Sequence, residues 1–214
     1  MALSAPAFAT ITAQTRLLVV APHPDDETLA NGLLIQRVHA AGGAVRVLLL
    51  TDGDNNPWPQ RWLERRWFIG AAERERWGRR RRTECGEALR RLGVPVSGLQ
   101  PLGWPDMGVL DRLLQADRQA LAELVAAVAD FAPNLIAMPA LGDRHPDHGA
   151  AHVLVRMALA RLGCAPALLG FLIHGRGGVM PAPEPAGMPA PPAVKATALA
   201  ASAPPLALRS RRFR

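Results

Sequence analysis

The sequence predicts an α/β protein built on one parallel β-sheet with helices on both faces. Short apolar runs alternate along the chain with longer stretches in which apolar residues recur every three to four positions. Some of the short runs, such as residues 17–20, are continuously apolar, which is typical of strands covered on both faces. Strands and helices that alternate in this way form right-handed parallel units.

Local patterns support each element in turn. The first helix has apolar residues at positions 29, 33, 34 and 38 and ends at a glycine pair, residues 42–43. The third strand is weak, because Gly98 and Pro101 interrupt it. The helix after residue 117 is strongly periodic. We expect strands at residues 17–20, 44–51, 97–102, 134–138 and 167–173, and helices at residues 28–41, 79–92, 117–131 and 150–162.

Length and composition indicate one globular domain with an extension. The chain has 214 residues, of which 49% are hydrophobic, so it can bury a substantial core. We expect the α/β domain to span residues 1–174, and the Pro/Gly-rich residues 175–214 to form an irregular lid over it. Two cysteines do not make a disulfide framework. Because residues 1–16 lack a basic region and a continuous apolar region, we expect no signal peptide and a cytoplasmic location.

The net charge of +7 comes almost entirely from arginine and favours acidic or phosphorylated partners. Residues 58–82 combine four tryptophans with many arginines. Three interpretations are open for this segment: amphipathic helices whose tryptophans pack inward, a flap over an anionic or lipid-linked sugar, or a nucleic-acid surface. We expect no specific nucleic-acid partner. The basic end at residues 209–214 suits a solvated tail or a peripheral contact with an anionic membrane.

Potential metal ligands gather in two turns, each of which follows an apolar strand. The first turn contains His23, Asp25 and Asp26, and the second contains His145 and His148. One aspartate would suffice to cap a helix, and two adjacent carboxylates repel each other unless a cation or a proton offsets them. His23, Asp26 and His148 would offer two nitrogens and one oxygen and leave a position for water, as catalytic zinc sites do. The same ligand types also bind Fe²⁺.

Four ordered motifs identify a family resemblance. They are His-Pro-Asp-Asp-Glu at residues 23–27, Arg-x-x-Glu at residues 81–84, Leu-Gly-Trp-Pro-Asp at residues 102–106 and His-Pro-Asp-His at residues 145–148. Together they resemble the PIG-L (LmbE-like) family of zinc-dependent N-deacetylases, over about residues 16–162. The resemblance implies a Rossmann-like sheet in the order 3-2-1-4-5, in which the first and fourth strands are neighbours and the two ligand turns meet.

The resemblance also implies a reaction, the removal of acetyl from an N-acetylglucosamine-type sugar or glycoconjugate, with Zn²⁺ as cofactor and Fe²⁺ as the alternative. The roles that it implies are a general base for Asp25, oxyanion stabilisation by His145 as an imidazolium, orientation of a histidine by Asp147, and sugar contacts for Arg81, Asp106 and Asp54. Some members use a tyrosine at the oxyanion, but this chain has none. The task then falls to the metal, His145, a backbone N–H group or Arg144.

Two other functions stay open at this point. An amidase that cleaves a larger acyl group from an amino-sugar conjugate would need the same ligands. A nucleic-acid-binding module would use residues 58–82 and would bind in a salt-dependent way. The sequence does not specify the aglycone or the oligomeric state.

Overall fold

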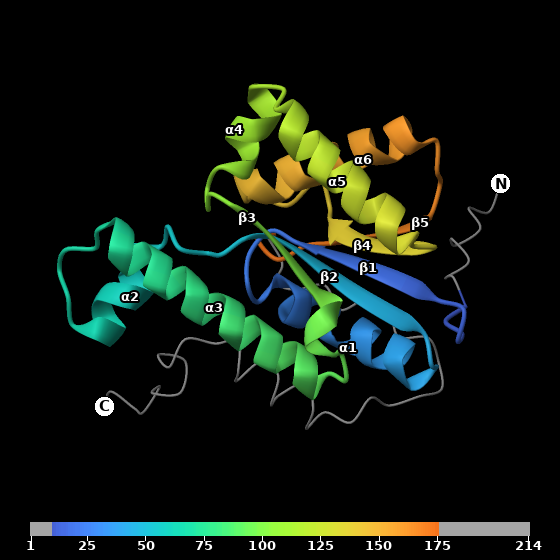
Figure 1. Cartoon of the computed structure of the whole chain (residues 1–214), viewed down its shortest axis with the longest axis horizontal. Coiled ribbons are helices and arrows are strands. Elements are labelled where there is room, and N and C mark those ends of the chain that lie inside the picture. Colours follow the sequence, from blue (N-terminus) through green and yellow to red (C-terminus); the bar gives the residue numbers. More distant parts are fainter. Residues whose placement is uncertain (1–9, 176–214) are drawn as a thin grey trace.

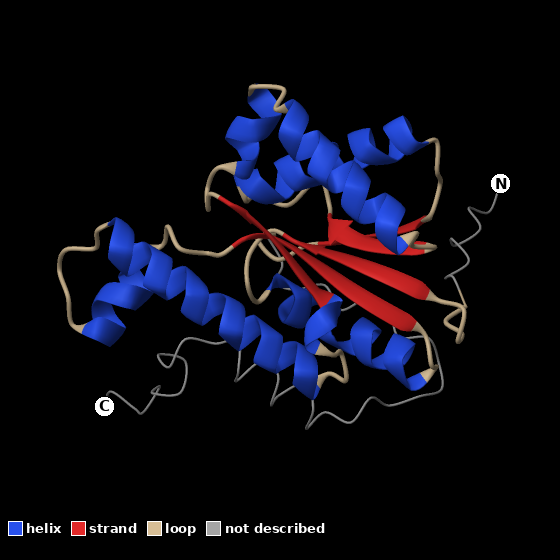
Figure 2. Cartoon of the chain, in the orientation of Figure 1, coloured by secondary structure: helices blue, strands red, loops and turns tan. Residues whose placement is uncertain are grey.

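The computed structural model describes residues 10–175, which form a five-stranded parallel sheet in the order β3-β2-β1-β4-β5. This is the order that the family resemblance implies, and both the α/β class and the order are confirmed. Figure 2 shows helices on both sides of the sheet. The strands are β1 (Arg16–Ala21), β2 (Ala44–Thr51), β3 (Leu99–Trp104), β4 (Leu135–Pro139) and β5 (Ala167–Phe171).

The helices form two layers (Figure 1). On one face, α1 and α3 cover the strands, and on the other face α4, α5 and α6 do so. Alternate residues of β1 serve the two layers: Leu18 packs in the cluster that contains Leu124 and Leu154, whereas Leu17 packs in the cluster with Ile35 and Leu89. The helices are α1 (Asp26–Ala40), α2 (Pro57–Glu64), α3 (Ala71–Arg91), α4 (Val109–Leu114), α5 (Arg118–Phe131) and α6 (Pro146–Leu162).

The structure corrects several sequence-based expectations about elements. Helices α1 and α6 begin at Asp26 and Pro146, so both ligand turns run directly into helices. The six-residue α4 was not predicted, and β5 ends at Phe171, before residue 173. Of the three interpretations of residues 58–82, the one in which the tryptophans pack inward holds for Trp77 but is wrong for the other three, which are exposed.

Some expectations concern residues outside the described range. The structure does not describe residues 176–214. The expected lid at residues 175–214 and the role of the basic end at residues 209–214 therefore stay predictions. None of the helices within residues 10–175 combines the length and the hydropathy that a membrane span requires.

The turn after α3 depends on a glycine. Gly93 has a φ angle of +88°, and a Cβ atom there would lie 2.4 Å from Cδ2 of His39 on α1. We expect Gly93→Ala to lower the free energy of unfolding by about 1–3 kcal/mol, because it combines left-handed strain with a steric clash. Gly163 is the matched control, since its φ angle is +64° and a Cβ atom would meet nothing within 4 Å. Urea unfolding of both variants separates the two effects, and an equal loss in both would show that the His39 contact contributes nothing.

Candidate metal centre

The two ligand turns lie side by side at the carboxyl edge of the sheet. One turn follows β1 and the other follows β4, and these strands are hydrogen-bonded neighbours. Because β2 and β3 lie on one side of β1 and β4 and β5 lie on the other, the strand order reverses between β1 and β4. A crevice forms at such a switch point in open α/β sheets, and ligands bind there.

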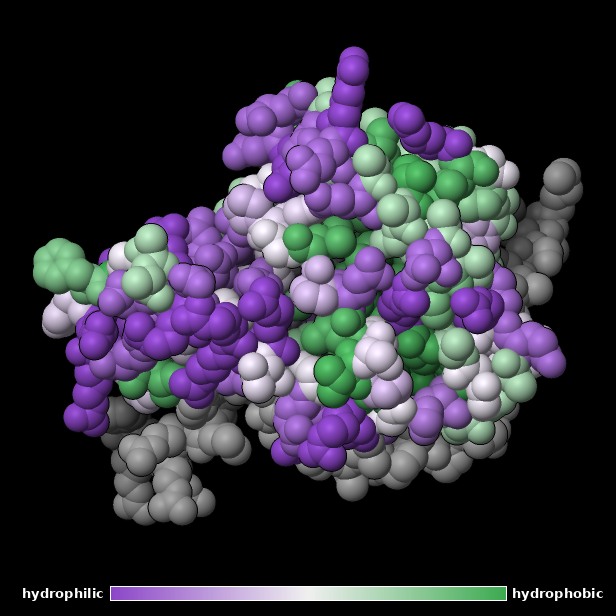
Figure 3. All heavy atoms as spheres, in the orientation of Figure 1, coloured by the Kyte–Doolittle hydropathy of each residue, from purple (hydrophilic) through white to green (hydrophobic). Residues whose placement is uncertain are grey.

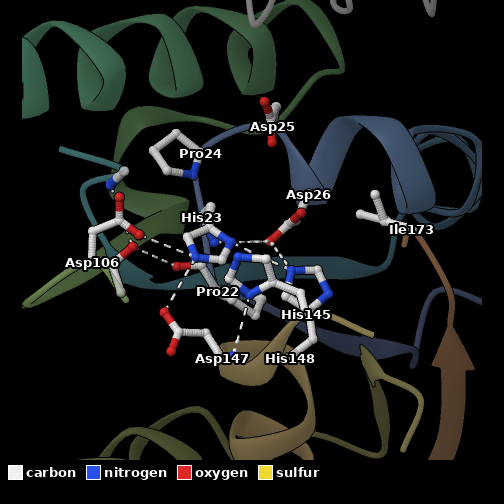
Figure 4. Close-up of polar contacts among 12 residues, drawn as sticks. Pro22, His23, Pro24, Asp25, Asp26, Asp106, His145, Asp147, His148 and Ile173 are labelled. Carbon is white, nitrogen blue, oxygen red and sulfur yellow. Dashed lines mark hydrogen bonds and ion pairs between the residues drawn. The ribbon is translucent and has the colours of Figure 1, made fainter. Parts of the chain in front are cut away.

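Three side-chain atoms converge on one point between the turns (Figure 4). Nδ1 of His23 lies 3.5 Å from Oδ2 of Asp26, Nε2 of His148 lies 3.3 Å from the same oxygen, and the two ring nitrogens lie 3.4 Å apart. Ligands about 2.0–2.2 Å from a tetrahedral metal ion lie roughly 3.3–3.6 Å from one another. The three atoms therefore fit the ligand set of a metal ion.

Carboxylates hold the far side of the His23 ring. Nε2 of His23 lies 3.3 Å from Oδ1 of Asp106 and 3.4 Å from Oδ2 of Asp147. Asp147 is itself fixed, because its Oδ1 accepts hydrogen bonds from the backbone N–H groups of Val109 and Leu110 at the start of α4. This arrangement orients the imidazole with Nδ1 toward the shared point, as outer carboxylates do in metal sites.

His148 has a similar partner, Asp143, which the sequence analysis did not assign. Nδ1 of His148 lies 3.1 Å from Oδ2 of Asp143, and both side chains are buried. Asp143 accepts hydrogen bonds from the backbone N–H groups of His145, Ile173 and His174, so it also connects the residues that follow β5 to the second turn. The signal was present in the sequence as an acid two positions before His145, inside the same ligand turn.

The electrostatics of the group favour a cation. Burial alone would lower the pKa of His23, but its contacts with Asp106, Asp147 and Asp26 raise it well above its ordinary value. Burial alone would raise the pKa of Asp26, but the neighbouring rings of His148 and His23 outweigh this effect and lower it. The carboxylates of Asp26, Asp106 and Asp147 thus favour a positive charge among them, which a protonated His23 or a bound cation would supply.

Asp25 is held apart from the three converging atoms. Its φ angle is 112°, in the left-handed region, and it is the N-cap residue of α1. Its Oδ2 accepts a hydrogen bond of 2.9 Å from Nη2 of Arg81, and the same Nη2 donates to the carbonyl oxygen of Pro24. Burial and the charge of Asp26 raise the pKa of Asp25 to about 7, despite the opposing charge of Arg81. A carboxylate with such a pKa suits general base chemistry near neutral pH.

His145 lies beside the other two rings. Its ring centroid is 4.6 Å from that of His23 and 5.1 Å from that of His148. Burial and the positive charges of His23 and His148 lower its pKa to about 4, so the expectation of an imidazolium is wrong for this arrangement. Nδ1 of His145 accepts a hydrogen bond from the backbone N–H of Asp147, which leaves the proton of the neutral ring on Nε2.

The three residues assigned to the sugar occupy different places. Arg81 is buried, and its guanidinium contacts Asp25 and Pro24. Asp106 contacts His23, and its Oδ2 accepts a hydrogen bond of 2.8 Å from the backbone N–H of Asn55. Asp54 lines a separate cavity of about 380 Å³ between α3 and the loop after β2. Of these three residues, only Asp106 contacts one of the three converging side chains, that of His23.

The chain is similar to proteins of one known family. The model of the PIG-L family, described as GlcNAc-PI de-N-acetylase, matches residues 18–159. A 1D-myo-inositol 2-acetamido-2-deoxy-alpha-D-glucopyranoside deacetylase of Mycobacterium leprae is 33% identical over 166 residues, which cover 72% of this chain and 53% of that relative. The chain therefore spans about half the length of this relative.

Solved structures show the same fold. A conserved protein of Thermus thermophilus superposes with a TM-score of 0.59 at 29% identity, over 88% of this chain and 78% of the other. The N,N'-diacetylchitobiose deacetylase of Pyrococcus horikoshii superposes with a TM-score of 0.63 at 20% identity, over 91% of this chain and 73% of the other. The match to the family over residues 18–159, which contain both ligand turns, shows that this chain belongs to the PIG-L (GlcNAc-PI de-N-acetylase) family.

Proposed function

We propose that this protein is a metal-dependent N-deacetylase that removes the acetyl group from an N-acetylglucosamine-type sugar or glycoconjugate. The observation that carries the proposal is the convergence of His23, Asp26 and His148 on one point, with Asp25 held beside them by a separate contact. Family membership and the deacetylase names of its relatives support the same reaction.

The proposed ligands are His23 Nδ1, Asp26 Oδ2 and His148 Nε2, and the proposed metal is Zn²⁺, with Fe²⁺ as the alternative. Zinc held there would polarise the acetyl carbonyl and lower the pKa of water toward neutrality. Asp147 and Asp106 would orient His23 through its Nε2, and Asp143 would orient His148 through its Nδ1.

Asp25 is the proposed general base. It would accept the proton of the attacking water and return it to the amine nitrogen when the carbon–nitrogen bond breaks. His145 is the proposed partner of the oxyanion. As a neutral ring it would donate its Nε2–H to the carbonyl oxygen, in place of the tyrosine that this chain lacks. Asp54 and Asp106 remain the proposed acceptors for sugar hydroxyl groups.

Arg81 is better explained as a positioning residue than as a substrate contact. We expect Arg81→Lys to lower kcat by about 10- to 100-fold with little change in KM, because the single nitrogen of lysine cannot hold Glu84, as Nη1 of Arg81 does, while also bridging Asp25 and Pro24, as Nη2 does. Steady-state kinetics at fixed metal content test this. Arg80→Lys is the matched control, since Arg80 is next in sequence but pairs with Glu84 alone among described acidic residues. A rise in KM at unchanged kcat would show instead that Arg81 contacts the substrate.

The proposed reaction is tested by acetate release. Metal-loaded protein would be incubated with N-acetylglucosamine conjugates that differ in aglycone, and with analogues that carry a longer acyl group. We expect acetate and free amine in equal amounts from at least one N-acetyl conjugate. Release of only the longer acyl groups would favour the amidase alternative. Protein that binds no zinc or iron would contradict the proposal.

A further inference from the structure

Four aromatic side chains stand on the outside of the molecule close together in sequence. Trp58, Trp62, Trp67 and Phe68 are 69%, 57%, 82% and 92% exposed, whereas Trp77 and Trp104 are buried. We call these four residues the aromatic tip. Trp58 and Trp62 are four positions apart on α2 and so share one helix face, and the other two follow in the connection to α3. Patches of this kind mark interaction sites in soluble proteins.

The aromatic tip is not needed to hold its own segment together. Helix α2 is fastened to α3 by polar contacts: the buried Gln60 donates from Nε2 to the carbonyl oxygen of Glu73 over 2.8 Å, and Arg76 pairs with Glu64. Arg66 also pairs with Glu73. These contacts connect α2 to α3 without Trp58, Trp62, Trp67 or Phe68, so the exposed rings are available for other contacts.

Positive charge surrounds the aromatic tip. Residues 57–80 contain seven arginines and three glutamates, in a chain whose total net charge is +7. Arg61 lies over the ring of Trp58, with its Cζ 5.2 Å from the ring centroid. Arg65 and Arg74 form no ion pair with any other described residue. The surface thus combines exposed indole rings with guanidinium groups that are not neutralised.

The segment also projects from the side of the molecule that carries the metal centre. It begins after β2, whose carboxyl end lies at the same sheet edge as the two ligand turns, and Figure 1 shows α2 and the first turns of α3 extending beyond the sheet. Figure 3 shows hydrophobic atoms at the outer end of this extension beside a largely hydrophilic surface. The loop before α2 reaches the centre, since Asn55 donates its backbone N–H to Asp106.

We propose that the aromatic tip docks on an anionic phospholipid surface. Indole rings and arginine side chains both have an apolar body and a polar end, and both partition to the interface between headgroups and acyl chains. Arginines near an anionic leaflet are attracted to its negatively charged headgroups. A second copy of the chain is a poorer occupant, because pairing through this surface would bring like charges together. A nucleic acid would usually bind in a groove, whereas this surface is the outer end of a projection.

The test is flotation of the full-length protein with vesicles of phosphatidylcholine alone and of phosphatidylcholine with about 30% phosphatidylglycerol. We expect binding to the anionic vesicles that decreases as salt is raised. The triple variant Trp58→Ser, Trp67→Ser, Phe68→Ser should bind at least about tenfold more weakly, because it removes three large apolar groups from the interface. Bilayers with brominated acyl chains should quench tryptophan fluorescence in the wild type and much less in this variant.

The matched control is Val96→Ser combined with Leu114→Ser, which removes two equally exposed apolar side chains from other parts of the surface. This double variant should bind anionic vesicles as the wild type does. The proposal would be overturned by a wild-type protein that does not float, or by equal binding of the triple variant. It would also be overturned if the triple variant lost only self-association in light scattering, or only binding to a single-stranded oligonucleotide.

Discussion

Asp25→Asn is expected to lower kcat by about 10²- to 10⁴-fold, the usual contribution of a general base. Asparagine has the same size and can still accept a hydrogen bond from Arg81, but it cannot take a proton from water. Asparagine is also among the few residues that tolerate a positive φ angle, which matters because φ is 112° at this position. Alanine at this position would add backbone strain to the loss of the carboxylate and obscure the cause.

The zinc content of Asp25→Asn shows whether its loss of activity comes from a missing base or from a missing metal ligand. Asp25 is held by Arg81, outside the three converging atoms, so the asparagine variant should bind zinc with wild-type stoichiometry. Asp111→Asn, which removes an exposed carboxylate on α4, serves as the control and should keep full activity. If Asp25→Asn lost zinc as well as activity, Asp25 would be a ligand and the base would have to be another group. If the activity of Asp25→Asn stayed within a few-fold of the wild type, Asp25 would not be the general base.

The sequence predicts the fold well where burial is continuous. β1, β2 and β4 were predicted because their apolar runs are long, whereas α4 was missed because six residues are too few to establish a helical period. The sheet order cannot be obtained from local patterns at all. It came from the resemblance to a family, and the strand pairing agrees with it.

Local sequence patterns also fail to predict how single side chains are oriented in the site. The sequence indicated the residue types of both ligand turns, but the direction in which each side chain points depends on packing. Arg81 reaches Asp25 because α3 crosses close to the loop after β2, where a Cβ atom on Gly78 would lie 3.0 Å from Cβ of Asp52. No hydrophobic pattern in the sequence predicts this close approach of α3 to the loop after β2.

The exposed tryptophans have a similar explanation. The alternation of tryptophan and arginine in residues 58–82 is compatible with either face of a helix turning inward. The face of α2 that is covered is the one that carries Gln60, whose buried side chain donates to the carbonyl oxygen of Glu73 on α3. A pattern rule that places aromatic residues inside fails when the contact between the helices is polar.

His148→Ala is expected to abolish metal binding and to reduce activity by more than about 10³-fold, because the stabilisation that a metal supplies to such a reaction is worth several kcal/mol. His148 is fully buried, and its Nε2 lies 3.3 Å from Oδ2 of Asp26. Removing the ring also leaves the buried carboxylate of Asp143 without its contact at 3.1 Å, so we expect some loss of stability in the metal-free protein.

His152→Ala is the matched control on the same helix. His152 lies one turn after His148, but its Nδ1 is 2.9 Å from the carbonyl oxygen of Pro139, so it is engaged away from the three converging atoms. This variant should keep its metal and most of its activity. If both variants lost metal equally, the loss would come from damage to α6 and not from a missing ligand.

Thermal unfolding gives a reading that does not depend on the substrate. A ligand that binds only the folded state at about 100 times its Kd stabilises a protein by about 2.7 kcal/mol. For a domain of this size, that corresponds to a rise in Tm of roughly 5–10 °C. Zinc should therefore raise the Tm of the wild type and of His152→Ala but not that of His148→Ala. An equal rise in all three would mean that zinc binds elsewhere, and the assignment of His23, Asp26 and His148 as its ligands would fail even if the protein were an active deacetylase.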